Sequence, residues 1–211
     1  MSAPGESRER RGRLRGQSLV EFSLILPIFL LILFGMMEFG FIFTHELTLE
    51  YATREGARVG AALGNGSGGS GLTCASGTNG ACVDPLIIAA VERVLSSPGS
   101  QVVISRVSQI VIYKANSAGA DTGTDNVWKY HQGTPQTVDG QLLDFGPTSA
   151  GWSASSRSSA APSPDAIGVS LVYTYDYVTP LGSILRFFGG NGGASLTLTD
   201  RTVMVLNPSA S

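Results

Sequence analysis

A membrane-length apolar segment near the N-terminus constrains this chain more than any other feature. It runs from Phe22 to Thr44 and contains one charged residue, Glu38. At 1.5 Å per residue, a helix of this length reaches roughly 34 Å, which is enough to cross a hydrocarbon core. Apolar side chains on all sides exclude an ordinary amphipathic surface helix. We therefore expect a transmembrane helix at about residues 22–44, in which Pro27 removes one backbone hydrogen bond.

The charges on the two sides of this segment differ in sign. Residues 1–16 contain five arginines and two glutamates, a net charge of +3, whereas residues from His45 onward contain nine basic and twelve acidic residues, a net charge of −3. This positive-inside pattern predicts residues 1–16 in the cytoplasm and the part after about residue 45 outside. The whole chain has a formal net charge of −2 and two lysines. It offers no basic patch for a phosphate backbone, so we expect no nucleic-acid partner.

The segment is not typical of a cleaved secretory signal peptide, because it is too long and no small-residue cleavage site follows it. Good helix formers continue instead to about Leu63, where Gly64 is typical of a helix end. The expected helix covers residues 17–63 and is roughly 70 Å long.

Three small residues lie at a spacing of four in the second half of this helix: Ala52, Gly56 and Gly60. Such a stripe lets another backbone approach closely. Two partners remain open, a helix of another subunit and the chain's own sheet, and the sheet is slightly favoured because it must pack against some element.

An acid, Glu21, stands at the start of the apolar segment in the stretch RGQSLVEF. A carboxylate buried there costs several kcal/mol unless a partner neutralises it. A chain cut after Gly16 would carry a new α-amino group on Gln17, four residues before Glu21, and that cation could pair with the acid of its own chain or of a neighbour. The alternative is a solvated carboxylate at headgroup depth, and the residues alone leave both open.

A basic leader, a glycine, four residues, a glutamate, an aromatic residue and an apolar helix together resemble the processing site of type IV prepilins. Over about residues 15–62 the chain is similar to the TadE-like pseudopilins of the tight-adherence (Tad/Flp) branch, and it shows a weaker likeness in IGVSLVYTYDY and ASLTLTDRTVMV near the C-terminus. The similar pieces of the helix are the RGQ…VEF start, Pro27, Phe34-Gly35, Glu38-Phe39-Gly40, and Ala52 with Arg54-Glu55-Gly56-Ala57-Arg58.

The resemblance implies that a membrane-embedded prepilin peptidase cuts between Gly16 and Gln17. It also implies that Glu21 helps the subunit to enter an assembly or to be recognised by the peptidase. Phe22 departs from the tyrosine that usually follows the glutamate in the short major subunits, and the long exterior domain favours a minor component. The implied partners are other pilins or pseudopilins and a pilus assembly platform. The implied location is the cytoplasmic (inner) membrane, with the C-terminal domain periplasmic or extracellular.

An alternative function is an unprocessed single-pass membrane protein. Its exterior domain would scaffold the same machinery or bind a surface ligand. An anchored enzyme has little support, because neither His45, expected at the membrane interface, nor His131 has a visible catalytic partner. We expect no catalytic residue, cofactor or metal site.

After the helix we expect a glycine-rich linker and cysteine loop at residues 64–83. Cys74 and Cys82 predict a short-loop disulfide outside the cytoplasm, with two free thiols as the alternative. A metal site would need more ligands than these two cysteines.

Residues 84–211 are expected to form an exterior α+β domain, in which the long helix packs on a small antiparallel sheet with one further short helix, as in pilins. DPLIIAAVERVLSS predicts that helix, with Asp84 as its N-cap. Residues 115–165 are expected to be a flexible insertion, with NVWKY and QLLDF as short edge strands and SAGWSASSRSSAAPSPD as a mobile loop. Trp128 and Trp152 mark this insertion as a candidate docking surface.

Overall fold

The computed structural model describes residues 7–66, 83–131, 135–138, 140–160, 162–187 and 195–207. Its first element, the helix α1, spans Ser7–Leu63 and contains Pro27. The chain forms two compact units. We call residues 1–41 with 177–194 the helical unit, and residues 42–176 with 195–211 the sheet domain.

The helical unit contains the first part of α1 and one short helix, α3 (Leu181–Phe187). α3 follows a turn at residues 177–180 that begins directly after the last residue of strand β6 (Ala166–Asp176). Tyr177 packs against the start of α3, since a Cβ added at Gly182 would lie 2.9 Å from Tyr177 Cδ2. Only a glycine fits the helix at that position without moving the ring.

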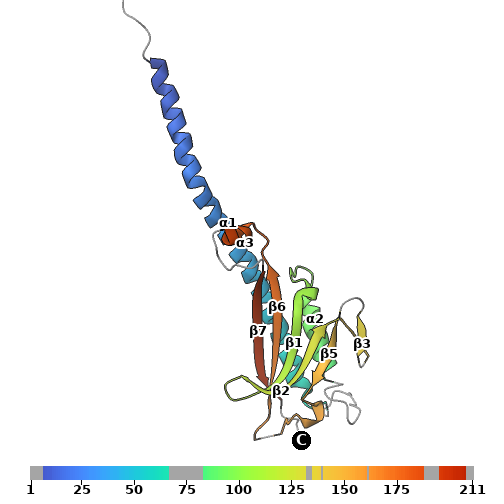
Figure 1. Cartoon of the computed structure of the whole chain (residues 1–211). Coiled ribbons are helices and arrows are strands. Elements are labelled where there is room, and N and C mark those ends of the chain that lie inside the picture. The colour runs from blue at the N-terminus through green and yellow to red at the C-terminus, as the bar shows by residue number, and fades with distance from the viewer. Residues whose placement is uncertain are drawn as a thin grey trace, which may run out of the picture. The chain divides into compact units, whose positions relative to one another are not determined.

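The sheet domain contains the rest of α1, the helix α2 (Asp84–Leu95) and a five-stranded antiparallel sheet. The strands lie in the order β5-β2-β1-β6-β7, with β6 between β1 and the edge strand β7, as Figure 1 shows. The β3–β4 hairpin and two 3₁₀ turns complete the domain. The remaining bounds are β1 Val107–Ala115, β2 Asp121–Tyr130, β3 Gln136–Val138, β4 Gln141–Leu143, β5 Phe145–Ala150, β7 Ser195–Val205, η1 Ile104–Arg106 and η2 Ala154–Ser156.

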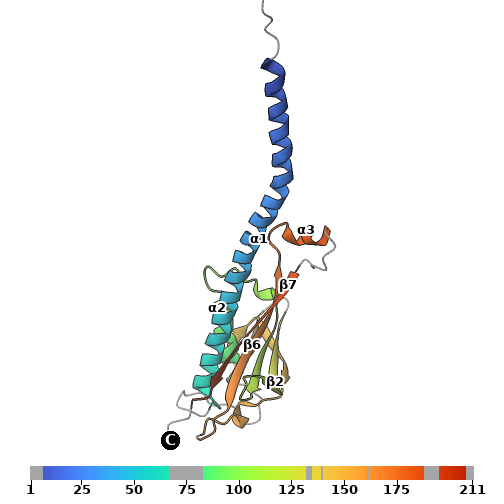
Figure 2. The same ribbon diagram turned by 90° about the vertical axis from the view of Figure 1, so that its left-hand side faces the viewer.

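Both helices of the sheet domain cover one face of the sheet, as Figure 2 shows. β6 forms the centre of that interface because its side chains alternate, as the sequence predicts. Its buried residues include Ile167, Val169, Leu171, Tyr173 and Tyr175, and α2 contributes Ile87, Ile88, Val91 and Leu95. These two apolar faces and the buried side of α1 pack together as the hydrophobic core.

The expected α+β class, with one long apolar helix before a small antiparallel sheet, is confirmed. Two details differ. The described residues contain two further α-helices, α2 and α3, where one was expected. NVWKY is not a short edge strand, because it belongs to the ten-residue β2, which pairs with β1 on one side and β5 on the other. Two parts of the segment 115–165, residues 121–130 and 145–150, thus belong to the main sheet.

Candidate functional site

The start of α1 carries the residues of the candidate processing site on an open helical surface. Gly16, Gln17, Glu21 and Phe22 are all exposed, and nothing lies within 4 Å of a Cβ added at Gly16. Because α1 begins at Ser7, Gly16 lies inside a helix, where glycine is less stable than alanine by roughly 0.5–1 kcal/mol. Gln17 Nε2 donates a hydrogen bond of 3.1 Å to Glu21 Oε1. The side chain of the first residue after the proposed cut therefore already reaches the carboxylate.

The next six turns of α1 expose large apolar side chains on every side of the helix. Soluble proteins rarely expose a continuous apolar surface of this size. The helix is long and apolar enough to cross a membrane. We conclude that the chain has the features of a single-pass membrane protein. The exposed side chains are Leu19, Val20, Phe22, Leu24, Ile25, Ile28, Phe29, Leu31, Ile32, Leu33, Met36, Met37 and Phe39.

Glu38 lies near the end of this surface, in a buried position that the sequence did not predict. Its side chain is buried, with 1% of its surface exposed. Its carboxylate accepts hydrogen bonds from the backbone N–H of Val178 (3.0 Å) and of Thr179 (2.8 Å), and from the Thr179 hydroxyl. A buried carboxylate needs such donors, because an unpaired one is costly. Glu38 therefore fixes the turn before α3 to α1 within the helical unit.

The small-residue stripe of α1 packs against elements of the chain's own sheet domain. Ala52, Gly56 and Gly60 are buried. A Cβ added at Gly56 would meet Val91 Cγ2 at 2.7 Å and Val169 Cγ1 at 3.4 Å. One added at Gly60 would meet Ile167 Cδ1 at 2.7 Å. The stripe thus lets α1 approach both α2 and β6 closely.

The two histidines lie in different surroundings. His45, which was expected at the membrane interface, is 5% exposed and packs inside the sheet domain. Its ring stacks on Tyr173 at 5.6 Å, meets Tyr175 edge-on at 4.9 Å, and places Nε2 3.1 Å from the carbonyl oxygen of Gln101. Pairing of α1 with the tyrosine face of β6 explains the burial. His131 is exposed, and its backbone N–H donates to the Asp144 carbonyl.

The tryptophans do not form a docking surface, because Trp128 and Trp152 are 3% and 2% exposed. Trp152 belongs to a buried polar cluster with Asp84, Asn126 and Arg157. Arg157 Nη2 donates to Asp84 Oδ1 at 2.6 Å, and its guanidinium carbon lies 4.6 Å from the centre of the Trp152 ring. Asn126 donates to Asp84 and to the Trp152 carbonyl, and accepts from the Trp152 N–H. The cluster joins α2, β2 and the segment that was expected to be a mobile loop.

Asp84 is therefore not the expected N-cap. Val83 occupies that position, without a side-chain cap, while Pro85 lies in the first turn. Burial raises the pKa of the Asp84 carboxyl, and the charge and hydrogen bonds of Arg157 and Asn126 offset part of that rise. The Arg157 contact directs this carboxylate into the core instead of toward the helix end.

The carboxylate of Glu92, on α2, binds the backbone at the start of β5. Its Oε1 accepts the backbone N–H of Asp144 at 2.9 Å and of Phe145 at 3.1 Å. Burial raises its pKa to about 7, although these hydrogen bonds act in the opposite direction. Glu92 is thus a group of the sheet domain whose charge state changes near neutral pH.

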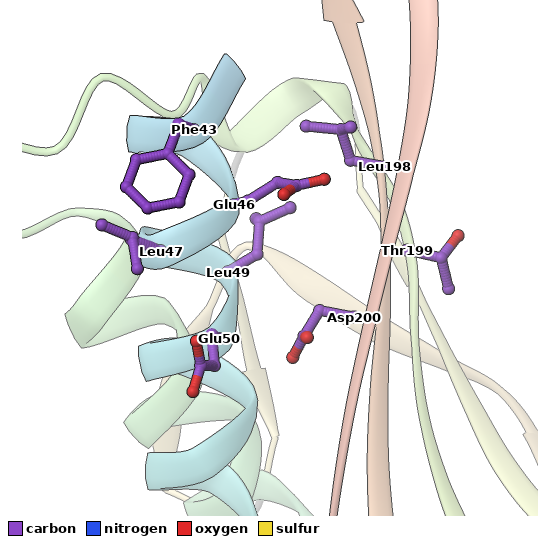
Figure 3. A pocket seen from close by; sticks show the side chains of 8 residues that line it. All are labelled: Phe43, Glu46, Leu47, Leu49, Glu50, Leu198, Thr199 and Asp200. Atoms are coloured by element: carbon purple, nitrogen blue, oxygen red, sulfur yellow. The ribbon is translucent and has the colours of Figure 1, made fainter. Parts of the chain in front are cut away.

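A groove of about 310 Å³ lies between α1 and the edge strand β7. Figure 3 shows Asp200 pointing from β7 toward α1, whereas Thr199 points away. Asp200 accepts a hydrogen bond from the Thr53 hydroxyl. Apolar and acidic side chains alternate around the groove, which is lined by Phe43, Glu46, Leu47, Leu49, Glu50, Leu198, Thr199 and Asp200.

Cys74 and Cys82 lie outside the described residues, so the expected disulfide stays a prediction. Within the described part of the chain, no group of three or more histidine, cysteine, aspartate or glutamate side chains is arranged to hold a metal ion.

Comparison with known proteins gives one family. Residues 16–58 match the family model described as TadE-like protein. The match begins at Gly16 and includes Glu21, the exposed apolar surface, Glu38 and part of the small-residue stripe. Neither a search of curated proteins nor a search of solved structures gave a significant match.

Proposed function

We propose that this chain, whose residues 16–58 match the TadE-like family, is a minor pseudopilin of a Tad-type pilus or secretion system. The observation that carries the proposal is the match itself, because it covers the helix start at which a pseudopilin is processed and assembled. Within the described part of the chain, one helix is long and apolar enough to cross a membrane, as a single-pass protein of the cytoplasmic membrane requires. Its basic residues 1–16 would lie in the cytoplasm and its sheet domain on the outer side.

Processing would occur between Gly16 and Gln17 by a prepilin peptidase. The side-chain contact of 3.1 Å between Gln17 and Glu21 supports this role, because it shows that one helical turn brings residue 17 to the acid. After cleavage the new α-amino group would replace a neutral amide donor with a cation. The carboxylate could then be neutralised within its own chain or by a neighbour in a bundle of helices.

Glu21 would promote assembly with other pilins or pseudopilins and with a platform protein. An exposed acid such as Glu21 at the start of a membrane helix is costly in a lone subunit and is stabilised when helices gather. The proposed activity is therefore association between helices and not catalysis.

The test of this proposal is incorporation of a Glu21→Gln variant. Cells that make the Tad-type machinery would carry the wild-type chain, Glu21→Gln or the matched control Glu46→Gln, which changes an exposed carboxylate on the same helix. We expect wild type and Glu46→Gln in isolated pilus or assembly complexes. Glu21→Gln should be depleted from them at an unchanged level in the membrane, because the amide cannot pair with the new α-amino charge. Equal incorporation of all three chains would contradict the proposed pairing.

A further inference from the structure

The contact between Glu38 and the turn before α3 has a consequence for the position of the membrane. The exposed apolar side chains before Glu38 begin at Leu19, and residues 19–38 would span roughly 30 Å as a helix, which matches a hydrocarbon core of about 30 Å. A span that begins at Leu19 is therefore long enough by Glu38, although Phe39 and Phe43 beyond it are also exposed. This places the outer boundary at Glu38, six residues before the end of the apolar segment at Thr44.

The backbone of the turn fits such a boundary. An unpaired N–H at hydrocarbon depth is not tolerated, and irregular backbone survives near the membrane only where protein groups satisfy it. Glu38 satisfies two successive N–H groups, those of Val178 and Thr179, and the Thr179 hydroxyl as well. The Thr179 Oγ1 in turn accepts the backbone N–H of Leu181 at 3.3 Å, which fixes the first residue of α3.

The composition of this segment suits the interface between lipid and water. α3 reads LGSILRF, in which one cation, Arg186, stands among apolar residues, and the Arg186 side chain is exposed. Val178 is 66% exposed although it is apolar, and Phe39, next to Glu38 on α1, is 70% exposed. Apolar residues with a cation are typical of helices that lie in the headgroup region. Exposed apolar side chains thus lie both on α1 next to Glu38 and in the turn that Glu38 binds.

We propose that residues 177–187 form a membrane-surface element, in which Glu38 holds the turn at the outer boundary and α3 lies in the headgroup region of the outer leaflet. The occupant of its apolar surface is lipid. A helix of seven residues is too short to be stable alone in water, so the Glu38 contacts and the lipid surface stabilise it together. The inference rests on the membrane-spanning part of the proposed function and on neither leader cleavage nor pilus assembly.

The experiment uses the full chain in vesicles of phosphatidylcholine and phosphatidylglycerol. Each variant carries one added tryptophan as a reporter. Val178→Trp tests the turn, and Leu142→Trp is the matched control in the sheet domain, since the two native side chains are 66% and 68% exposed. Phe29→Trp reports the membrane span itself. The wild-type protein supplies the background, because Trp128 and Trp152 are buried. Quenching is measured with lipids brominated near the headgroup and with iodide in the water.

We expect brominated lipid to quench Val178→Trp several-fold more strongly than Leu142→Trp, and iodide to show the reverse order. Adding Glu38→Ala to Val178→Trp should shift the reporter toward iodide quenching. Glu38→Gln should shift it less, since its amide oxygen still accepts one of the N–H bonds.

The proposal is overturned if Val178→Trp behaves like Leu142→Trp while Phe29→Trp is quenched by brominated lipid. Protection of Val178→Trp from both quenchers at every lipid-to-protein ratio also overturns it, because a neighbouring chain would then cover the turn. If brominated lipid does not quench Phe29→Trp, then α1 does not span the membrane. That result would contradict both this proposal and the membrane part of the proposed function.

Discussion

At the residue scale, two buried acids of this protein bind partners that lie far away in the chain. Glu38 reaches the backbone of residues 178–179, and Asp84 reaches the guanidinium of Arg157. Both acids are fully buried, so each depends on its donors. A buried ion pair adds little net stability, but loss of one partner leaves an uncompensated charge.

Glu92 makes the stability of the sheet domain depend on pH. Its pKa is about 7 in the folded protein against an ordinary value of 4.5. Between these two values the folded chain holds more protons than the unfolded chain, so the free energy of unfolding falls as pH rises from about 4.5 to 7 and then levels off. Glu92→Gln keeps the acceptor oxygen for Asp144 and Phe145 and removes the charge.

We therefore expect Glu92→Gln to be more stable than wild type at pH 8 by about 1 kcal/mol, a value reduced for the partial solvent screening of this group. At pH 5 the two proteins should be nearly equal. Thermal unfolding of the full chain in detergent at both pH values measures this. The same difference at pH 5 and pH 8 would contradict a raised pKa.

At the element scale, α1 packs closely against α2 and β6. A Cβ added on its small-residue stripe would clash with side chains of these two elements. Val91 is stiff and close to Gly56, whereas the nearest atom to Gly60 is the flexible end of Ile167. We expect Gly56→Ala to lower the free energy of unfolding by about 1–3 kcal/mol, as overpacking does. Gly60→Ala should cost less.

The matched control is Gly40→Ala, on the same helix, where nothing lies within 4 Å of the added Cβ. It should be neutral or stabilising by up to about 1 kcal/mol, because alanine favours a helix over glycine. Denaturant unfolding in detergent compares the three. If Gly56→Ala proved as mild as Gly40→Ala, the close approach of α1 to α2 would be wrong.

The elements predicted from the sequence are those with a strong period of their own. The face of α2 and the alternation of β6 are apparent from Ile87, Val91, Val169 and Leu171 alone. The length and position of β2 were not predicted because its first half, DTGTDN, is polar. Only its pairing with β1 and β5 shows that it is an inner strand. Propensity says little about such a strand, since neighbours decide its burial.

The candidate site could likewise be predicted only where its contacts are local in the sequence. Glu21 is apparent from the sequence because it stands out at the start of an apolar segment, and its relation to Gln17 is local. The role of Glu38 was missed although it is the one charge inside the segment. Its partners are backbone N–H groups 140 and 141 residues away, and backbone groups leave no signal in side-chain type. The burial of His45 was missed because the side chains that cover it, Tyr173 and Tyr175 of β6, are far away in the sequence.

At the scale of the whole molecule, one helix carries three different features along its length. Its start carries the candidate processing site, its middle has the apolar surface of a membrane span, and its end forms part of a folded core. The TadE-like match covers parts of all three. The account as a whole depends on whether the first of these is used, because an unprocessed chain would remain an anchored domain with a basic tail.

The intact mass of the membrane-extracted protein tests this most directly. In cells with an active prepilin peptidase, we predict a chain that begins at Gln17 and lacks residues 1–16. In cells without the peptidase, the same protein should retain them. Retention of residues 1–16 in both kinds of cell would contradict the account and would favour a stably anchored scaffold.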